Sequence, residues 1–385
     1  MSGKRKDTKG RVLKAGESQR KNGSYDYRYT DIHNKRRVIY AKTLDELRKK
    51  EDDIIRDLHD GIDYAAGEVA VSELIDRYMN LKRSLSDNSR RAYDTCINRI
   101  KSGAFGERQI KTVKLSDAKS YLVSLHDDGL KQNTIQIFLN VLRPAFEMAV
   151  DDDMIRKNPF KFRLSDIVPR DATIRDALTK AQQERYLAFI DKYGNDNYYD
   201  DIVVLLGTGL RVSELYGLTK SDVNFKANCI HIRRQLCRTA EKPYFITTPK
   251  TSSGIRNIPM TEAVRDTLKK VIQNRKPSSV EMIIDGYGGF LFLDKDGKPK
   301  VAMHLENYMR MMQKRYVELN GNSLPKITPH VLRHTFCTNA QQAGLDVKSL
   351  QYVMGHSNVS TTLDIYTHSN FDLAQRAFEQ IASSI

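Results

Sequence analysis

Residues 329–336 read PHVLRHTF, residues 354–357 read MGHS, and residues 361–368 read TTLDIYTH. In the first run His330 and Arg333 stand three positions apart, which places both side chains on one face of a helix. The later runs add His356 and Tyr366. Cationic side chains, imidazoles and a phenol are the groups needed to attack a phosphate, so we expect a fold that brings these three segments together.

Two segments further upstream extend this set. Residues 209–215 read GLRVSEL and place Arg211 at the start of a helix, with Glu214 as a structural brace for that helix. Residues 249–251 read PKT and place Lys250 in a turn between two expected strands. The six candidate catalytic residues, in chain order, are Arg211, Lys250, His330, Arg333, His356 and Tyr366.

These residue types suit the cleavage of a phosphodiester. The pentacoordinate transition state carries extra negative charge on its non-bridging oxygens, onto which two guanidiniums can fork. Removing one such donor typically costs about 3–4 kcal/mol of transition-state stabilisation. A phenol with a pKa of about 10 needs help to lose its proton. The leaving 5′ oxygen needs a proton, which a lysine can supply.

The ordered set resembles the active-site motif of the tyrosine recombinases of the phage integrase type, and most resembles that of conjugative-transposon integrases. The resemblance extends over almost the whole chain and is strongest from Leu205 to His368. It implies a multidomain α+β protein. The domains would be an arm-type DNA-binding sheet-and-helix module (residues 1–67), an all-α core-binding bundle (68–165) and a mixed, mainly helical DNA breaking-rejoining catalytic domain (174–385).

The resemblance also implies a role for each residue. Tyr366 would attack the phosphate and form a 3′-phosphotyrosyl link, while Arg211 and Arg333 would clamp the phosphate. The other three residues would move protons or position the phosphate: Lys250 at the leaving oxygen, His330 at the tyrosine and His356 at the phosphate. No cofactor or metal is implied, since the covalent link preserves the bond energy for rejoining.

Several of these residues could also have simpler roles. Lys242 and Arg256 lie in the same expected hairpin region as Lys250 and are its rivals. His330 could merely cap a helix, and with His334 it could suggest a metal pair, although no Cys or carboxylate stands at the right spacing. At the level of the whole protein, two further functions are a topoisomerase-like enzyme that relaxes DNA and a DNA-binding protein that has lost catalysis.

The composition is consistent with a DNA-binding protein. The net charge is +15, from 63 basic and 48 acidic residues, and a globular chain this basic usually binds a polyanion. No long apolar run and no secretory signal is visible, so we expect a cytoplasmic, nucleoid-associated bacterial protein without a membrane partner. The four cysteines show no zinc spacing and indicate buried free thiols: Cys96, Cys229, Cys237 and Cys337.

The first 42 residues hold thirteen basic and four acidic residues. Within them, residues 25–31 alternate aromatic with polar side chains, as a half-buried strand does, and residues 37–41 form a second strand. Residues 43–46 read TLDE, a capping box that opens a helix. Its apolar stripe is expected to contain Leu44, Leu47, Ile54, Ile55 and Leu58. This pattern predicts a small basic ββ(β)α module with a DNA-binding sheet.

The pattern from about residue 69 to residue 163 is helical. We expect helices around Val71–Leu81 and Tyr93–Ile100, a third opened by Ser116-Asp117 and a fourth opened by Asn133-Thr134, with Asn158-Pro159 ending the bundle. A set of basic residues is expected to face phosphates: Arg90, Arg91, Arg99, Lys101 and Lys131. Residues 169–173 are the expected linker. A second capping box (residues 179–182) and strands near residues 229–232, 244–248 and 255–259 follow.

The last helix carries an apolar stripe at helical spacing, formed by Leu373, Ala377, Phe378 and Ile381. Packing within its own domain is the default for such a stripe. The resemblance implies instead that it docks on a neighbouring protomer in a homotetramer on DNA. The partners implied are double-stranded DNA, at core and arm sites, and further copies of the chain. The sequence leaves open whether an accessory excision factor takes part.

Overall fold

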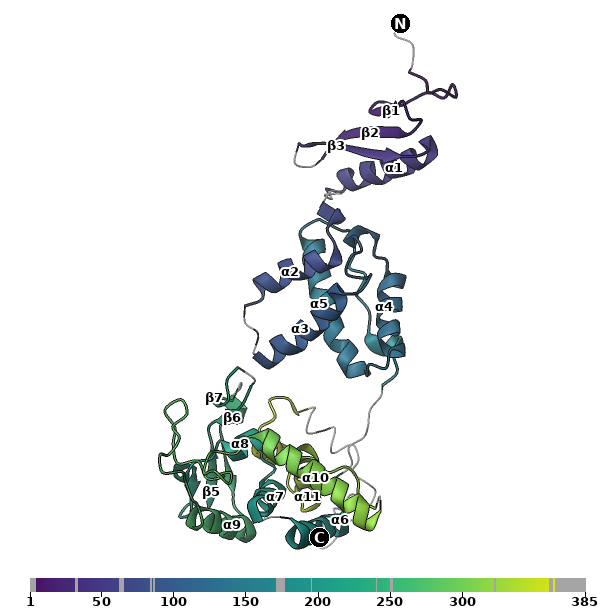
Figure 1. The fold of residues 1–385 in the computed structure, drawn as a ribbon. Coiled ribbons are helices and arrows are strands. Elements are labelled where there is room, and N and C mark those ends of the chain that lie inside the picture. The colour runs from purple at the N-terminus through teal and green to yellow at the C-terminus, as the bar shows by residue number, and fades with distance from the viewer. Residues whose placement is uncertain are drawn as a thin grey trace, which may run out of the picture. The chain divides into compact units, whose positions relative to one another are not determined.

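The structure is a computed structural model. It describes residues 5–31, 34–61, 66–83, 85, 87–170, 177–194, 196–239, 241–249, 252–321, 323–359 and 363. The chain separates into two compact units, residues 1–173 and 174–385 (Figure 1). Lys250, Tyr366, most of the expected linker and the stripe of the last helix lie outside the described residues. The mixed α+β class predicted from the sequence is confirmed, and the three domain boundaries remain predictions.

The first unit begins with a three-stranded antiparallel sheet in the order β1-β2-β3. Its strands are β1 (Glu17–Gln19), β2 (Tyr25–Thr30) and β3 (Arg36–Ala41), and Tyr25 lies opposite Ala41. Helix α1 (Leu44–His59) packs against one face through a small core that includes Tyr25, Leu44 and Leu47 (Figure 1). Because side chains alternate along a strand, Asp26, Arg28 and Thr30 lie on the opposite face.

The start of α1 differs in detail from the expected capping box. The Thr43 hydroxyl accepts from Glu46 N at 3.2 Å, as predicted. The Glu46 carboxylate, however, accepts from Lys42 N at 3.2 Å instead of from Thr43 N. Ile55, expected in the apolar stripe, is 48% exposed and is not part of the core. The helix therefore buries a narrower stripe than its sequence suggests.

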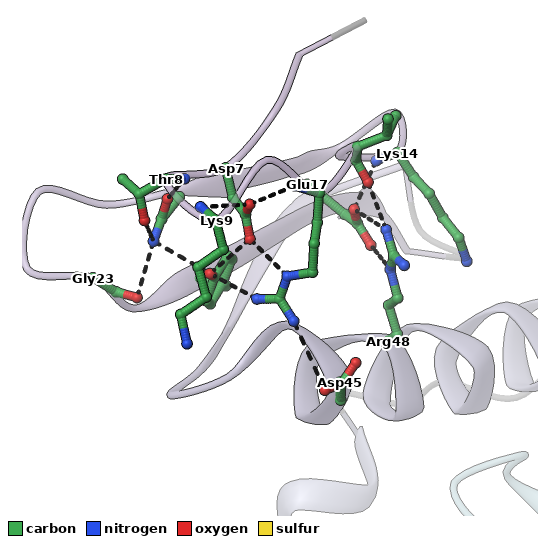
Figure 2. Close-up of polar contacts among 12 residues, drawn as sticks. Asp7, Thr8, Lys9, Lys14, Glu17, Gly23, Asp45 and Arg48 are labelled. Carbon is green, nitrogen blue, oxygen red and sulfur yellow. Dashed lines mark hydrogen bonds and ion pairs between the residues drawn. The ribbon is translucent and has the colours of Figure 1, made fainter.

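A polar network holds the N-terminal segment on the sheet and on α1. In Figure 2 Glu17 points toward Arg48 of α1, whose Nε donates to the buried carboxylate at 3.0 Å. Asp7 accepts from Arg11 Nε at 2.9 Å and from the Tyr25 hydroxyl at 3.0 Å. Burial alone would raise the pKa of Asp7, but these hydrogen bonds, with those from the backbone, lower it to about 2. Asp7 is therefore a carboxylate at neutral pH, and it holds the segment in place.

The rest of the first unit is a helical bundle of α2 (Val71–Leu81), α3 (Asp87–Lys101), α4 (Leu115–Asp127) and α5 (Gln132–Asp151). Helix α5 contacts the other three. The bundle core also takes in Phe160, Leu164 and Val168, so Asn158-Pro159 does not end the bundle as predicted. Short 3₁₀ turns cover residues 66–68, 110–112 and 164–166.

Several helix boundaries and charges in this bundle differ from the expectation. The N-caps of α4 and α5 are Lys114 and Lys131, so these helices start slightly earlier than Ser116 and Asn133. Leu81, the last residue of α2, is 74% exposed and is not part of the bundle core. Two of the basic residues expected to face phosphates form ion pairs within the bundle. Arg99 pairs with Asp128 at 2.7 Å, and Lys101 pairs with Asp76 at 2.6 Å.

The second unit surrounds a larger core with helices and two small sheets. Strands β4 (Val223–Asn224), β5 (Cys229–Ile232) and β8 (Arg256–Pro259) form one sheet, and β6 (Gln235–Cys237) and β7 (Phe245–Thr247) form the other. The helices are α6 (Lys180–Tyr193), α7 (Asp196–Thr208), α8 (Val212–Tyr216), α9 (Glu262–Gln273), α10 (Ala302–Asn320), α11 (Pro329–Gln342) and α12 (Val347–Met354). Helix α7 packs against α11 and α9.

The expected strands of this unit are present, while β4 and β6 were not predicted. The strands on either side of Lys250 in the sequence, β7 and β8, belong to different sheets and are not paired with each other as a hairpin would require. The second capping box is confirmed: Thr179 and Gln182 bond each other's backbone. All four cysteines are free, but only Cys96 and Cys337 are buried. In the part of the chain that the structure describes, no helix is long and apolar enough to cross a membrane.

Candidate active site

Arg211 is positioned by a tight turn between α7 and α8. Gly209 follows the end of α7 with φ +64°, a left-handed conformation that favours glycine. A Cβ on Gly209 would lie 2.3 Å from Cδ1 of Phe336 on α11. Only glycine therefore lets the turn after α7 approach α11 this closely. Leu210 is then buried in the core, and Arg211 becomes the N-cap of α8, as predicted.

Glu214 forms ion pairs with two arginines, Arg211 and Arg256. Its carboxylate is fully buried and accepts from Arg211 N at 2.9 Å and from Arg211 Nη1 at 2.8 Å. It also accepts from Arg256 Nη1 and Nη2 at 3.1 and 2.9 Å. Burial alone would raise the pKa of Glu214, but the hydrogen bonds and charge of Arg256 hold it below its usual value. Glu214 is therefore ionised, and it braces α8 as its spacing predicts.

Arg333 comes from α11 and is only 5% exposed. Its Nη1 donates to the Gly209 carbonyl at 2.6 Å, and its Nη2 donates to the Met354 carbonyl and to His356 Nε2, the latter at 3.0 Å. Burial, followed by the charge of Arg211, lowers the pKa of Arg333 to about 9. The guanidinium still carries its charge at neutral pH, and an anion in the site would relieve its burial cost.

His356 is held beside Arg333 by the end of α12. Gly355 closes that helix in the left-handed conformation, with φ +63°, and its carbonyl accepts from Arg211 Nη2 at 3.2 Å. Because a guanidinium can only donate, His356 Nε2 must accept, which requires a neutral ring with its proton on Nδ1. Burial and the charge of Arg333 lower the pKa of His356 to about 4, in agreement with a neutral ring.

His330 lies in the first turn of α11 and is exposed. It does not cap that helix, because the N-cap is Thr328, whose hydroxyl accepts from Val331 N at 3.3 Å. A cavity of about 880 Å³ between α10 and the start of α11 has Arg211, His330 and Arg333 in its wall. Among the described residues, no group of three or more His, Cys, Asp or Glu side chains could hold a metal ion.

The structure thus brings together four of the six candidates. Arg333 hydrogen-bonds His356, and Arg211 hydrogen-bonds the carbonyl of Gly355, the residue before His356. His330 lines the same cavity as both arginines. Lys250 and Tyr366 lie outside the described residues. Arg256, a rival of Lys250 by its place in the sequence, has a fully buried side chain bonded to Glu214. Its nearest site partners are 42 and 97 residues away in the chain, so no local pattern could have identified it.

The electrostatic result is a cationic pocket. The carboxylate of Glu214 pairs with the guanidiniums of Arg211 and Arg256 and feels the charge of Arg333, and His356 adds no charge at neutral pH. Arg211 keeps 35% of its side chain exposed and Arg333 reaches the same cavity wall, so both can meet a ligand. Two converging guanidiniums are suited to the two non-bridging oxygens of a phosphodiester.

Three family models match the chain, one after another. The DNA binding domain of tn916 integrase matches residues 1–58, the phage integrase SAM-like domain matches residues 70–166, and the phage integrase family matches residues 176–372. The transposase from transposon Tn1545 of Streptococcus agalactiae serotype V is 39% identical over 396 residues, covering 99% of this chain and 97% of that protein. The transposase from transposon Tn916 of Enterococcus faecalis has the same identity and coverage.

Solved structures agree with this result. The Tn1549 transposon integrase, in complex with a circular intermediate DNA, is 40% identical with a TM-score of 0.76, covering 81% of this chain and 99% of that one. A lambda integrase dimer bound to a COC′ core site has a TM-score of 0.58 over 94% of this chain and 97% of that one, and at 16% identity it shows a shared fold alone.

The chain belongs to the phage integrase family and is a tyrosine-type site-specific recombinase. Within that family it is of the conjugative-transposon type, similar over nearly its whole length to the Tn916 and Tn1545 proteins.

Proposed function

We propose that this recombinase cuts and rejoins double-stranded DNA to integrate and excise the mobile element that encodes it, through a phosphotyrosine at Tyr366. The single observation that carries the proposal is the paired placement of Arg211 and Arg333. Both guanidiniums are fixed by backbone carbonyls, at 3.2 Å from Gly355 O and 2.6 Å from Gly209 O, and both line one cavity. Donors that are fixed in advance lose little freedom when charge develops on the phosphate.

In the proposed reaction Arg211 and Arg333 bind the two non-bridging oxygens of the scissile phosphate. The Tyr366 oxygen attacks phosphorus, and the bond from phosphorus to the 5′ oxygen breaks as the new ester forms. His330 takes the phenol proton, and Lys250 gives a proton to the leaving 5′ oxygen. His356 holds Arg333 on the phosphate and hydrogen-bonds the phosphate itself. Rejoining is the reverse attack by a 5′ hydroxyl on the phosphotyrosine.

The experiment is to trap the covalent complex on a nicked suicide duplex from the element's ends and to map the linked residue by mass spectrometry. Tyr366→Phe should abolish the complex without reducing DNA binding. Tyr352→Phe is the matched control, because this tyrosine is on α12 near the site and 51% exposed, and it should cleave normally. Covalent complex formed by Tyr366→Phe, or linked through another residue, would refute the assignment.

For the whole chain we propose three DNA-contacting parts, with arm sites bound by residues 1–67, core sites bound by residues 68–165 and chemistry in residues 174–385. The last two parts would clamp the duplex, and four protomers would assemble on two duplexes in the cytoplasm, at the nucleoid. In support, the similar Tn1549 integrase was solved with a circular intermediate DNA and with transposon right end DNA, and a lambda integrase tetramer was solved on a Holliday junction. An accessory excision factor is a further proposed partner, testable by adding host extract to purified excision reactions.

A further inference from the structure

The face of the N-terminal sheet that points away from α1 is cationic and aromatic, yet it has a carboxylate near its centre. Arg28, Arg36, Val38 and Tyr40 are exposed on the strands β2 and β3. Asp26, on the same face, lies directly opposite Tyr40 and is only 3% exposed. In simple Coulomb terms a carboxylate here opposes the binding of a polyanion. Its role must therefore lie in the groups that it contacts.

Each oxygen of the Asp26 carboxylate has an arginine beside it. Oδ1 lies 3.7 Å from Arg20 Nε, and Oδ2 lies 3.5 Å from Arg28 Nε. The Ser18 hydroxyl, from β1, also donates to Oδ1 at 2.8 Å and fixes the carboxylate itself. In both ion pairs the nearest guanidinium atom is Nε, so the carboxylate holds each guanidinium at the end opposite its Nη nitrogens.

The two arginines remain accessible. The side chain of Arg28 is 74% exposed and that of Arg20 is 51% exposed. Arg20 is held further by Tyr40, whose ring centre lies 4.4 Å from the guanidinium carbon and whose hydroxyl lies 3.4 Å from Nη2. Both arginines stay largely in water, so these ion pairs contribute little to stability. The arrangement therefore does more to orient two guanidiniums than to hold the module together.

We propose that Asp26 is a positioning residue that orients Arg20 and Arg28 to read base edges of duplex DNA in the major groove. This inference rests on the proposed DNA-binding role of the sheet. A guanidinium fork reads guanine through O6 and N7, and a β-ribbon fits the width of the major groove. An arginine that is already held in the orientation that reads guanine loses less side-chain entropy when it binds. The gain in affinity therefore applies only to DNA whose sequence matches these contacts.

The test uses the full chain and two duplexes of equal length, the terminal DNA of the mobile element and an unrelated sequence. Footprinting first defines the segment that the wild type protects and Arg28→Ala does not. If Arg28→Ala leaves every protected segment intact, the sheet does not bind that DNA and the proposed function of the module fails. If a segment is lost, Asp26→Asn is then measured on it.

Asp26→Asn should weaken binding to that segment by about tenfold, the discrimination expected of roughly one forked base contact. Binding to the unrelated duplex should be unchanged or slightly tighter, because a negative charge is removed. Asp52→Asn, on the exposed surface of α1, removes the same charge and should alter neither. Equal tightening of both duplexes by Asp26→Asn would overturn the proposal, since Asp26 would then act only as a charge.

A second variant keeps the test decisive if Asp26→Asn unfolds the module, which far-UV circular dichroism would reveal. Arg28→Lys keeps the charge at an exposed position but has no fork. The affinity of Arg28→Lys for the segment should fall about tenfold, and its affinity for the unrelated duplex should stay unchanged. If Arg28→Lys binds the segment and the unrelated duplex with the same ratio of affinities as the wild type, the proposal is overturned independently of Asp26.

Discussion

Replacing Glu214 with glutamine removes one negative charge from the centre of the guanidinium cluster and leaves the size of the side chain unchanged. The Glu214 side chain is 0% exposed and so is that of Arg256, its partner at 2.9 Å. In the Glu214→Gln variant an amide nitrogen, which can only donate, takes the place of one carboxylate oxygen and faces guanidinium donors. Arg256 becomes a buried charge without a counter-charge at that position.

The magnitude follows from burial. Removing one partner of a buried ion pair costs about 3–5 kcal/mol, because the remaining charge stays out of water. The loss of the Arg211 contact adds less, about 0.2–1 kcal/mol, since 35% of that side chain is exposed and water can replace the carboxylate. Against a total stability of about 5–15 kcal/mol, the Arg256 term dominates. Strand cleavage should fall by about 10²–10³-fold as Arg211 loses its fixed position.

The assay is urea unfolding monitored by far-UV circular dichroism, because the chain contains no tryptophan for fluorescence. Single-turnover formation of the covalent complex gives the catalytic effect. Glu306→Gln is the matched control, since this residue lies on the same cavity but is exposed, and its cost should stay within about 0.5 kcal/mol. The double variant Glu214→Gln with Arg256→Met should recover most of the lost stability, because no buried charge then remains unpaired.

The effect of Glu214→Gln should also depend on pH. The folded-state pKa of Glu214 is lowered below its ordinary value of 4.5, so its stabilisation is fully present above pH 4.5 and is lost as pH falls through the folded value. The difference between wild type and Glu214→Gln should therefore be greatest at neutral pH and shrink in acid. A single variant within about 1 kcal/mol of wild type, with normal cleavage, would refute the role assigned to Glu214.

Three further predictions concern other positions. Gly209→Ala should cost about 1–3 kcal/mol in urea unfolding and reduce cleavage further, because its Cβ would meet Phe336 at 2.3 Å and move the carbonyl that holds Arg333; wild-type values for both would contradict it. His356 has its pKa lowered from 6.5 to about 4, so the free protein should lose stability as pH falls across that interval, and His356→Gln should lack this part of the loss. Burial and the hydrogen bond with Glu17 raise the pKa of Glu51 above 4.5, so stability falls as pH rises from 4.5 through the raised value. Glu51→Gln should raise the thermal midpoint at pH 7, by about 4–8 °C for each kcal/mol gained, with little change below pH 4.5; equal shifts at both pH values would show that charge is not the cause.

The local elements of the site could be predicted from the sequence because their determinants are close together in the chain. Arg211 and Glu214 are three residues apart and form the start of α8 by themselves. His330 and Arg333 share one helical face for the same reason. The strands β2 and β3 follow from the local pattern of apolar and polar side chains. The fold class and the family also followed from such short motifs in a constant order, whereas the roles of the individual site residues remain predictions.

The tertiary structure decided what depends on contacts between distant segments. Strand β1 is three residues long and entirely polar in sequence, and only its pairing with β2 makes it a strand. The bundle continues past Asn158-Pro159 because Phe160 finds a place in its core, which a local breaker signal cannot show. Arg256 reaches Glu214 only because β8 and α8 meet in the folded unit. The neutral state of His356 likewise depends on Arg333, 23 residues before it. Hydrogen-bond partners and burial set charge and orientation, and both arise only when the chain has folded.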